Sequence, residues 1–321
     1  MGVLKLKFAM YTTLAIIIGV STLIVAAIML LAGITNILAI MAMIILVNLI
    51  QWLTAPYIIE ALYGVREASP LAYGWLHEMV ERLSAKSGIS KPKVMIAEID
   101  IPNAFAYGSP LTGNRIAVTR GLLNTLKRGE IEAVLGHEIG HLVHKDVQIM
   151  MLASLLPALL YYIGYIFVYG IRSDREEAGA LALIGILSII ASFILNLFVL
   201  GLSRLREYYA DRHSALIVED GPRKLQLALA KIVAYTSKAV SLGVNVHSYS
   251  SFRHLLIADP SSALRDYEQL REYYSEYSLV ERIKRRKLTF WDNLIELFST
   301  HPNMVKRMRA LDEIAKELGY T

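Results

Sequence analysis

The chain has 321 residues, of which 55% are hydrophobic, and its mean hydropathy is +0.45. These values are too apolar for an ordinary soluble domain and indicate membrane-spanning segments. The absence of cysteine excludes disulfides and thiolate-bound metals, which leaves His, Glu and Asp as metal ligands. The net charge of +5 is typical of membrane proteins that keep Lys and Arg on the cytoplasmic side, so it does not indicate nucleic-acid binding.

The first feature in chain order is an uncharged stretch from Phe8 to Ile59. It is more than twice as long as one membrane crossing requires. We predict one span over 9–31 and a second over 36–54, with the break near Gly33. No small-residue cleavage site followed by polar chain is present, so we expect a retained anchor and not a signal peptide.

Residues 60–146 are polar and mixed in pattern. Ser69-Pro70 suits the start of a helix, because Pro is favoured at the first helical position, and we expect this helix to run to Ser87. Short apolar runs bounded by turn residues predict three strands, over 94–99, 104–107 and 115–119. A small sheet is therefore expected ahead of a helix that begins near Glu130.

That helix contains a His-Glu-x-x-His motif formed by His137, Glu138 and His141. Residues four apart share a helix face, so both imidazoles can bind one metal ion. Glu138 lies beside them and can accept a proton from a water at that ion, which is the arrangement of zinc peptidases. His144 lies near the same face, but no Gly turns the chain back toward the ion, so we rate it as a poor candidate ligand.

Two further uncharged stretches, 147–171 and 178–203, each have the length of a membrane span. Soluble core helices rarely stay uncharged for so long, so we predict a second helical hairpin with a short charged loop over 172–177. The basic residues that flank the four predicted spans are Lys5, Lys7, Lys127, Arg128, Lys145, Arg204, Arg206 and Arg212. The positive-inside rule then places both termini and the metal helix in the cytoplasm.

Glu207 and Asp211 follow the fourth predicted span and, being four apart, share a helix face. The metal helix enters the membrane after Asp146, and the hairpin returns the chain at Ser203 on the same side. Glu207 should therefore come close to the two histidines and complete a His2Glu site with one open position. Asp211 can accept the second ring N–H of a ligand, for which we predict His137.

The rest of the chain is polar. Residues 222–240 predict an amphipathic helix, whereas the Ser- and Tyr-rich residues 244–278 match no pattern that we can assign. The basic run 281–287 has two interpretations, a solvated face, which we favour, and contact with anionic lipid. A His-Pro pair is expected to open a last helix over 301–318. The other histidines lack partners at ligand spacing and are expected to be structural or exposed: His77, His213, His247 and His254.

The order of these features resembles that of the HtpX-type membrane zinc metallopeptidases, which are related to the CAAX prenyl endopeptidases. Besides the spans and the acidic pair, the resemblance rests on motifs on both sides of the second hairpin. These are Asn103-Ala104-Phe105-Ala106 with Gly108, the segment His137–His141, and His301-Pro302 with Arg307. The joint order is far more specific than any one motif.

The resemblance implies a gluzincin-type catalytic domain with one zinc ion per chain on His137, His141 and Glu207. Glu138 is then the catalytic base, and His301 assists the tetrahedral intermediate. Substrate is expected to contact the sheet edge and the late motif, at Asn103, Ala104, Phe105, Ala106 and Arg307. An extended peptide held by main-chain hydrogen bonds would be cut with little regard to its side chains. That tolerance suits quality control of misfolded or damaged membrane proteins during stress, which the family resemblance also implies.

The expected fold is mainly α and integral to the membrane, with four transmembrane helices in two hairpins and a cytoplasmic zinc-protease domain that contains a small sheet. We expect four domains along the chain. Residues 1–59 form a transmembrane hairpin, and residues 60–146 form a catalytic region with the metal helix. Residues 147–203 form a second hairpin, and residues 204–321 form a helical catalytic region with the third ligand. The expected location is the cell membrane, and the expected partners are protein substrates and the lipid bilayer.

Other functions make different demands on the same residues. A CAAX-type processing peptidase would share the site but cut a narrower set of substrates. An intramembrane protease would place the motif within a span, whereas here charged or ligand-type residues surround it. A transporter would need ionisable groups inside the spans, and a metal-binding membrane scaffold would not need Glu138.

Overall fold

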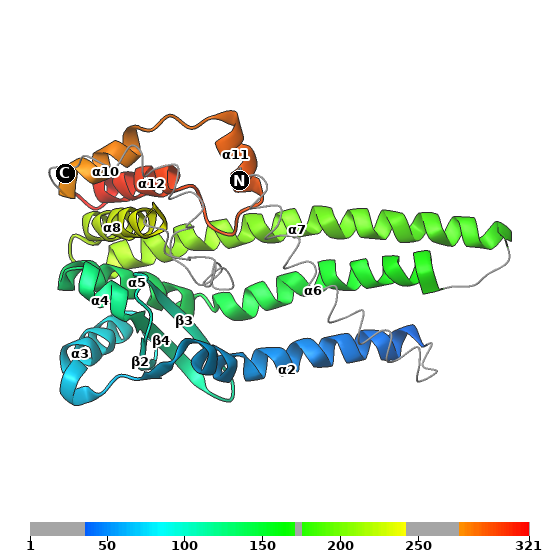
Figure 1. Ribbon diagram of the computed structural model, residues 1–321, viewed down its shortest axis with the longest axis horizontal. Coiled ribbons are helices and arrows are strands. Elements are labelled where there is room, and N and C mark those ends of the chain that lie inside the picture. Colours follow the sequence, from blue (N-terminus) through cyan, green and yellow to red (C-terminus); the bar gives the residue numbers. More distant parts are fainter. Residues whose placement is uncertain (1–35, 171–174, 242–275, 321) are drawn as a thin grey trace. The chain divides into compact units, whose positions relative to one another are not determined.

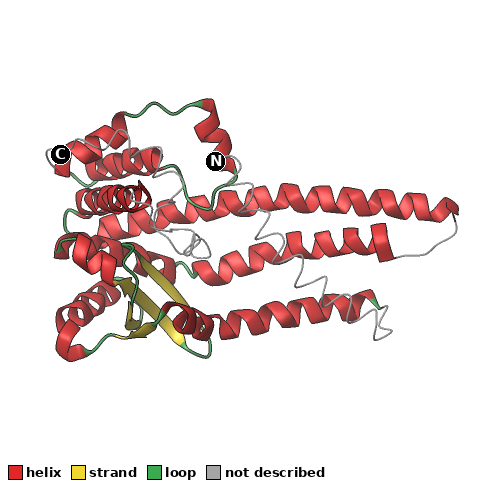
Figure 2. Ribbon diagram, viewed as in Figure 1, coloured by secondary structure: helices red, strands yellow, loops and turns green. Residues whose placement is uncertain are grey.

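The computed structural model describes residues 36–170, 175–241 and 276–320, and it is mainly helical with one small sheet (Figures 1 and 2). The chain divides into two compact units. The first comprises the residues up to Trp52 together with those from Gln148 to Ser203. The second comprises Leu53–Val147 and the residues from Arg204 onward, and it contains the sheet.

Three of the described helices are long and apolar enough to cross a membrane: α2 (Ile37–Tyr63), α6 (Asp146–Tyr165) and α7 (Arg175–Ile217). A short π-helical segment, η1 (Ile166–Gly170), continues α6. Helices of span length are thus confirmed at three of the four predicted positions. The remaining predicted span, over 9–31, lies outside the described residues.

Within the first unit, α6 and α7 pack closely. A Cβ atom at Gly164 would lie 2.6 Å from the carbonyl oxygen of Gly185, and one at Gly185 would lie 2.7 Å from the carbonyl oxygen of Gly164. The hydroxyl of Ser192 donates to the carbonyl oxygen of Pro157 at 2.7 Å. Membrane helices associate through small residues and hydrogen bonds of this kind, so the two helices pack as the predicted second hairpin requires.

α7 continues without a break beyond the predicted span, to Ile217. No Gly or Pro lies between Ser203 and Ile217, so nothing in the sequence ends the helix at its last uncharged residue. In contrast, α6 is separated from the preceding helix, α5 (Arg128–Val143), by Lys145, whose φ of 53° lies in the left-handed region. α6 therefore begins abruptly, at Asp146.

The sheet of the second unit has the strand order β1-β2-β4-β3. Its strands are β1 (Val65–Glu67), β2 (Lys93–Ala97), β3 (Ala104–Ser109) and β4 (Gly113–Thr119). β2 and β4 are parallel, and the other two neighbouring pairs are antiparallel. The three predicted strands are confirmed, whereas β1 is too short to show an alternating pattern. β3 forms one edge of the sheet.

The helices α3 (Pro70–Lys86), α4 (Arg120–Thr125) and α5 contact this sheet. They build the main hydrophobic core together with α8 (Gly221–Ser241), α10 (Glu276–Arg285) and α12 (Met304–Glu317). α11 (Phe290–Leu297) lies between α10 and α12 in the chain, and none of its residues, all of which the structure describes, belongs to this core. α3 and α8 confirm two predicted helices, and α4, α10 and α11 were not predicted. α12 begins at Met304 and not at His301, because the side chain of Asn303 caps the helix by accepting the N–H of Val305 at 3.0 Å.

Candidate metal centre

α5 carries the His-Glu-x-x-His motif and is buried on several sides. It contacts β3, α3 and α8, and residues 133–140 are all buried. The carboxylate of Glu130 accepts the backbone N–H of Lys127 at 2.8 Å and pairs with Lys231 of α8 at 2.6 Å. The motif therefore projects from a helix that the surrounding structure holds in place.

Two glycines on α5 allow α7 to approach it. A Cβ atom at Gly136 would lie 3.0 Å from Oγ of Ser214, and one at Gly140 would lie 3.0 Å from Cα of Ala210. The hydroxyl of Ser214 also donates to the carbonyl oxygen of Ala133 at 2.6 Å. A larger side chain at either glycine would push the helices apart, so this contact sets the distance between the motif and the acidic residues of α7.

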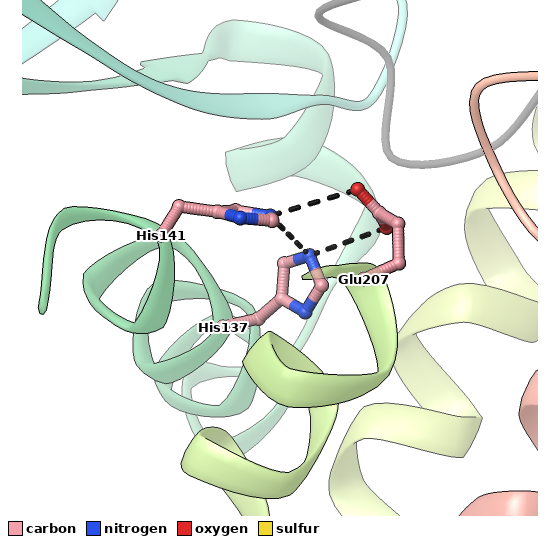
Figure 3. Close-up of side chains that lie close together, drawn as sticks. All are labelled: His137, His141 and Glu207. Carbon is pink, nitrogen blue, oxygen red and sulfur yellow. Dashed lines mark hydrogen bonds and ion pairs between the residues drawn. The ribbon is translucent and has the colours of Figure 1, made fainter. Parts of the chain in front are cut away.

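His137, His141 and Glu207 converge across this contact (Figure 3). The Nε2 atoms of the two imidazoles lie 3.1 Å apart. Oε2 of Glu207 lies 3.7 Å from Nε2 of His137, and Oε1 lies 3.6 Å from Nε2 of His141. The structure thus brings together the three side chains that the sequence predicts as metal ligands.

A carboxylate faces the second ring nitrogen of each imidazole. Oδ1 of Asp211 lies 2.9 Å from Nδ1 of His137, which is the contact that the sequence predicts. Oδ2 of Asp146 lies 2.6 Å from Nδ1 of His141, a contact that sequence reasoning missed. Because a carboxylate accepts hydrogen bonds, this arrangement favours the tautomers that carry the ring proton on Nδ1 and keep the lone pair on Nε2.

Three acceptor groups, two imidazole lone pairs and one carboxylate, therefore face one another. They repel unless a cation lies between them. Tetrahedral zinc with ligand bonds of about 2.0–2.1 Å holds its ligand atoms roughly 3.4 Å apart, and the measured separations are 3.1, 3.6 and 3.7 Å. Both the donor set and its spacing fit a catalytic zinc ion.

Arg307 of α12 connects the two acidic residues of α7. Its Nε and Nη2 donate to the carboxylate of Asp211 at 2.9 and 2.6 Å, and its Nη1 lies 3.2 Å from Oε2 of Glu207. The prediction that Arg307 contacts substrate is not supported, because its side chain is fully buried.

The two acidic residues are buried as well. Burial by itself raises the pKa of both carboxyls, but nearby cationic groups outweigh it. His301 and Arg307 hold the pKa of Glu207 well below its usual range, and Arg307 and His137 lower the pKa of Asp211. Both side chains are therefore charged at neutral pH, as a ligand and its supporting acceptor must be.

Glu138 lies beside the cluster and is also buried. Its Oε2 accepts the backbone N–H of Ala106, on the edge strand β3, at 2.8 Å. Burial raises the pKa of the Glu138 carboxyl, and Glu207 adds to this rise, while His141 and His137 oppose it. A carboxylate whose pKa is raised by burial is suited to take up and return a proton.

The other predicted substrate residues lie on β3 or directly before it. The side chains of Asn103, Ala104 and Phe105 are buried and belong to the interior of the unit. The predicted contact of this segment with substrate, which is made by main-chain hydrogen bonds, stays a prediction. Ala106 is partly exposed, and its N–H points away from β4.

His301 also reaches the cluster, from the loop between α11 and α12. Its Nδ1 lies 3.2 Å from Oε1 of Glu207. His144 does not reach the cluster, because it ends α5 and packs against the rings of Tyr209 and His213, with centroid distances of 5.9 and 5.7 Å. Nε2 of the partly buried His77 lies 2.8 Å from the carbonyl oxygen of Ala68. His247 and His254 lie outside the described residues.

Residues 70–315 match the sequence model of peptidase family M48. The chain belongs to peptidase family M48. Protease HtpX homologues from Thermoplasma acidophilum and Aeropyrum pernix are 40% and 41% identical to it, over 84% of this chain in both cases and over 83% and 84% of the relatives. The crystal structure of S. mikatae Ste24p shares the fold, with a TM-score of 0.55 at 18% identity, over 97% of this chain and 66% of that one.

This M48 peptidase is thus a metalloprotease, which confirms the predicted family and enzyme class. The segment matched to the family includes the whole cluster on α5 and α7, together with His301 and Arg307. Three apolar helices of span length agree with a membrane protein of the HtpX type.

Proposed function

We propose that this M48 peptidase is a zinc-dependent endopeptidase that cuts extended segments of misfolded or damaged membrane proteins. His137, His141 and Glu207 would hold one zinc ion per chain. The observation that carries the proposal is the convergence of their acceptor atoms at 3.1–3.7 Å. The buried carboxylate of Glu138 lies beside them and is not needed as a ligand.

The groups behind the ligands support this assignment. Asp211 and Asp146 each face the Nδ1 atom of one His ligand and so fix its tautomer and orientation. Each of these carboxylates is in turn paired with an arginine, Arg307 or Arg206. Ligands that are held by a carboxylate, which an arginine holds in turn, lose little conformational freedom when the ion binds. This favours metal affinity and preorganises the site for catalysis.

A zinc ion bound there supplies a Lewis acid that polarises the scissile carbonyl and lowers the pKa of a bound water to about 7. Glu138 accepts a proton from the attacking water and passes it to the leaving amine. The N–H of Ala106 fixes Oε2 of this carboxylate, which leaves Oε1 for the proton. His301 lies close enough to the cluster to donate a hydrogen bond to the oxyanion that forms on the carbonyl.

The proposed substrate site is the outer edge of β3. In an antiparallel pair, alternate residues direct their main-chain groups away from the partner strand, so the partly exposed Ala106 and Gly108 present theirs to that edge. The N–H of Ala106 is held by Glu138, which leaves its carbonyl oxygen for a peptide. An extended peptide added there would be bound by its backbone. Such binding tolerates varied side chains, as the clearance of misfolded proteins requires.

The proposed location of this site is the cytoplasmic face of the cell membrane. Lys145 lies at the start of α6, and Arg204 and Arg206 lie where the uncharged part of α7 ends. The positive-inside bias favours the cytoplasm for these ends. The same argument places the chain's start there, because Lys5 and Lys7 precede the first predicted span.

The proposal is tested by the masses of fragments from an unfolded casein substrate, incubated with the purified protein in nanodiscs. We expect internal cleavage that a zinc chelator abolishes and that added zinc restores. A prenylated C-terminal peptide, assayed in parallel, separates the CAAX-type alternative, which predicts cutting of that peptide alone. Casein cleavage that is indifferent to the chelator would contradict the proposal.

A further inference from the structure

α11 turns its two acidic side chains inward and three of its large apolar side chains outward. Phe290, Trp291 and Leu297 are 73%, 58% and 40% exposed, and we call these three side chains the α11 face. Asp292 is only 5% exposed, and the side chain of Glu296 is 11% exposed. Ile295 is buried beside them and attaches the helix to the protein. A helix that faces water keeps acidic side chains outside and large apolar side chains inside, so the α11 face is built for a different environment.

Specific contacts hold the acidic side chains in this inward position. Asp292 accepts the backbone N–H of Thr289 at 2.9 Å in the capping box of α11, and it pairs with Arg286 at 2.8 Å. Glu296 accepts the backbone N–H of Asn303 at 3.0 Å and also pairs with Lys306. Rotating the helix to hide its aromatic residues would break the contacts with Arg286, Asn303 and Lys306, whereas the capping box would turn with the helix. The exposure of the α11 face is therefore fixed by the fold.

The C-terminal end of α11 is hydrogen-bonded to α7 at Arg204, directly after the uncharged stretch of that helix. Arg204 is the first charged residue after the uncharged residues 178–203. Its guanidinium donates to the carbonyl oxygens of Glu296 and Ser299, at 2.8 Å in both cases. Arginine in this position places its charge at the level of the lipid headgroups. An eight-residue helix is about 12 Å long, so the whole of α11 lies within about that distance of the headgroup level.

The residues just before α11 are basic and exposed. The side chain of Arg285 is 84% exposed, and Lys287 is exposed as well. Exposed aromatic residues beside Lys and Arg are the combination that proteins place at membrane interfaces, where rings enter the headgroup–acyl boundary and cations meet anionic lipid.

We propose that the α11 face inserts into the headgroup–acyl boundary of an anionic leaflet, with Arg285 and Lys287 against the lipid headgroups. The bilayer, and not water or another protein, then covers Phe290, Trp291 and Leu297. α11 is followed directly by the loop that carries His301. Lipid contact at the α11 face thus anchors the segment that brings this side chain to the cluster. The proposal depends on membrane insertion and not on the proposed peptidase chemistry.

The three tryptophans of the chain allow a direct test. A protein with Trp52→Phe and Trp75→Phe reports on Trp291 alone, and one with Trp52→Phe and Trp291→Phe reports on Trp75 alone. Trp75 is the matched control, because it lies in the same unit but is half-buried on α3, with the guanidinium of Arg128 4.9 Å from its ring centre. Both proteins are placed in nanodiscs that contain phosphatidylglycerol and lipids brominated near the headgroup.

We expect brominated lipid to quench Trp291 emission at least twofold more than Trp75 emission. The difference should shrink in nanodiscs of phosphatidylcholine alone, and in an Arg285→Gln/Lys287→Gln protein but not in a Lys93→Gln control. Equal quenching of the two tryptophans would overturn the proposal. A Trp291 that is shielded from both brominated lipid and aqueous iodide would also overturn it, because a protein segment would then cover the α11 face. Quenching that is indifferent to lipid charge would overturn the anionic preference.

Discussion

Replacing Asp211 by Asn is expected to weaken zinc binding and to destabilise the fold at the same time. The Asn side chain can still accept the Nδ1–H of His137 through its oxygen. Its NH2 group, however, would meet Nε or Nη2 of Arg307, which lie 2.9 and 2.6 Å from the carboxylate oxygens. Two donors would then face each other, and a fully buried guanidinium would lose its bidentate partner.

The expected magnitude follows from this geometry. Removing one partner of a buried ion pair costs about 3–5 kcal/mol. The low end applies here, because Glu207 remains 3.2 Å from Nη1 of Arg307. The loss of the charged acceptor behind His137 should weaken zinc affinity by roughly 10–100-fold.

Asp146→Asn is the matched control. Asp146 stands behind His141 as Asp211 stands behind His137, so the same roughly 10–100-fold loss of zinc affinity is expected. Its partner Arg206 also donates to the carbonyl oxygen of His144, so it keeps an acceptor in the variant, and the loss of stability should be smaller than for Asp211→Asn.

Both variants are measured by zinc competition with a chromophoric chelator and by the apparent melting temperature in nanodiscs with and without zinc. Equal melting temperatures for the two apo proteins would refute the reasoning about Arg307. Zinc affinity at the parent level in both variants would refute the assignment of these carboxylates as supports for the ligands.

Three further predictions address the site and the topology. Glu207→Ala should lose most of the bound zinc, as measured by metal analysis of the purified protein, and full stoichiometry would remove Glu207 from the ligand set. Gly140→Val should force α5 and α7 apart, because its Cβ would lie 3.0 Å from the α7 backbone. We expect about 1–3 kcal/mol of destabilisation and weaker zinc binding. Unchanged zinc affinity would show that the contact between the two helices does not set the geometry of the site. Since the chain has no cysteine, a Cys at Ser173 should be labelled from outside sealed cells and a Cys at Ser90 should not. The reverse labelling pattern would invert the proposed orientation.

The ligand cluster could be predicted from the sequence because each step relied on local periodicity or span length. The four-residue spacing of His137 and His141 places them on one helix face, and the spacing of Glu207 and Asp211 does the same. Two uncharged stretches of span length then imply that the chain returns to the side from which it left. These arguments need no knowledge of how side chains pack in the second unit.

The missed features depend on tertiary packing. Asp146 reaches His141 only because Lys145 adopts a left-handed backbone conformation that ends α5, and no pattern in the sequence requires this turn. Arg307 lies 96 residues from Asp211 along the chain, and its burial follows from where α12 docks. A charged residue is expected at the surface by default, and the substrate contact predicted for Arg307 came from the family resemblance and not from packing.

α11 was missed for a related reason. Its apolar residues lie on both sides of the helix, since Phe290 and Trp291 point outward and Ile295 is buried. Periodicity assigns apolar residues to one core-facing side, and this helix has no such single side. The interpretation of the basic run also changes, because Lys284 pairs with Asp312 and Arg286 with Asp292, which leaves part of the run buried in ion pairs.

Glu138 is proposed to be the base of a zinc peptidase and not a structural residue beside a metal. The most direct measurement compares Glu138→Gln with the parent protein for zinc content and for the rate of casein cleavage. The account predicts full zinc content, because Glu138 is not a ligand, and a rate that falls by roughly 10²–10⁴-fold, because the proton acceptor is lost. Cleavage by the zinc-loaded variant at near the parental rate, with contaminating proteases excluded, would contradict the account.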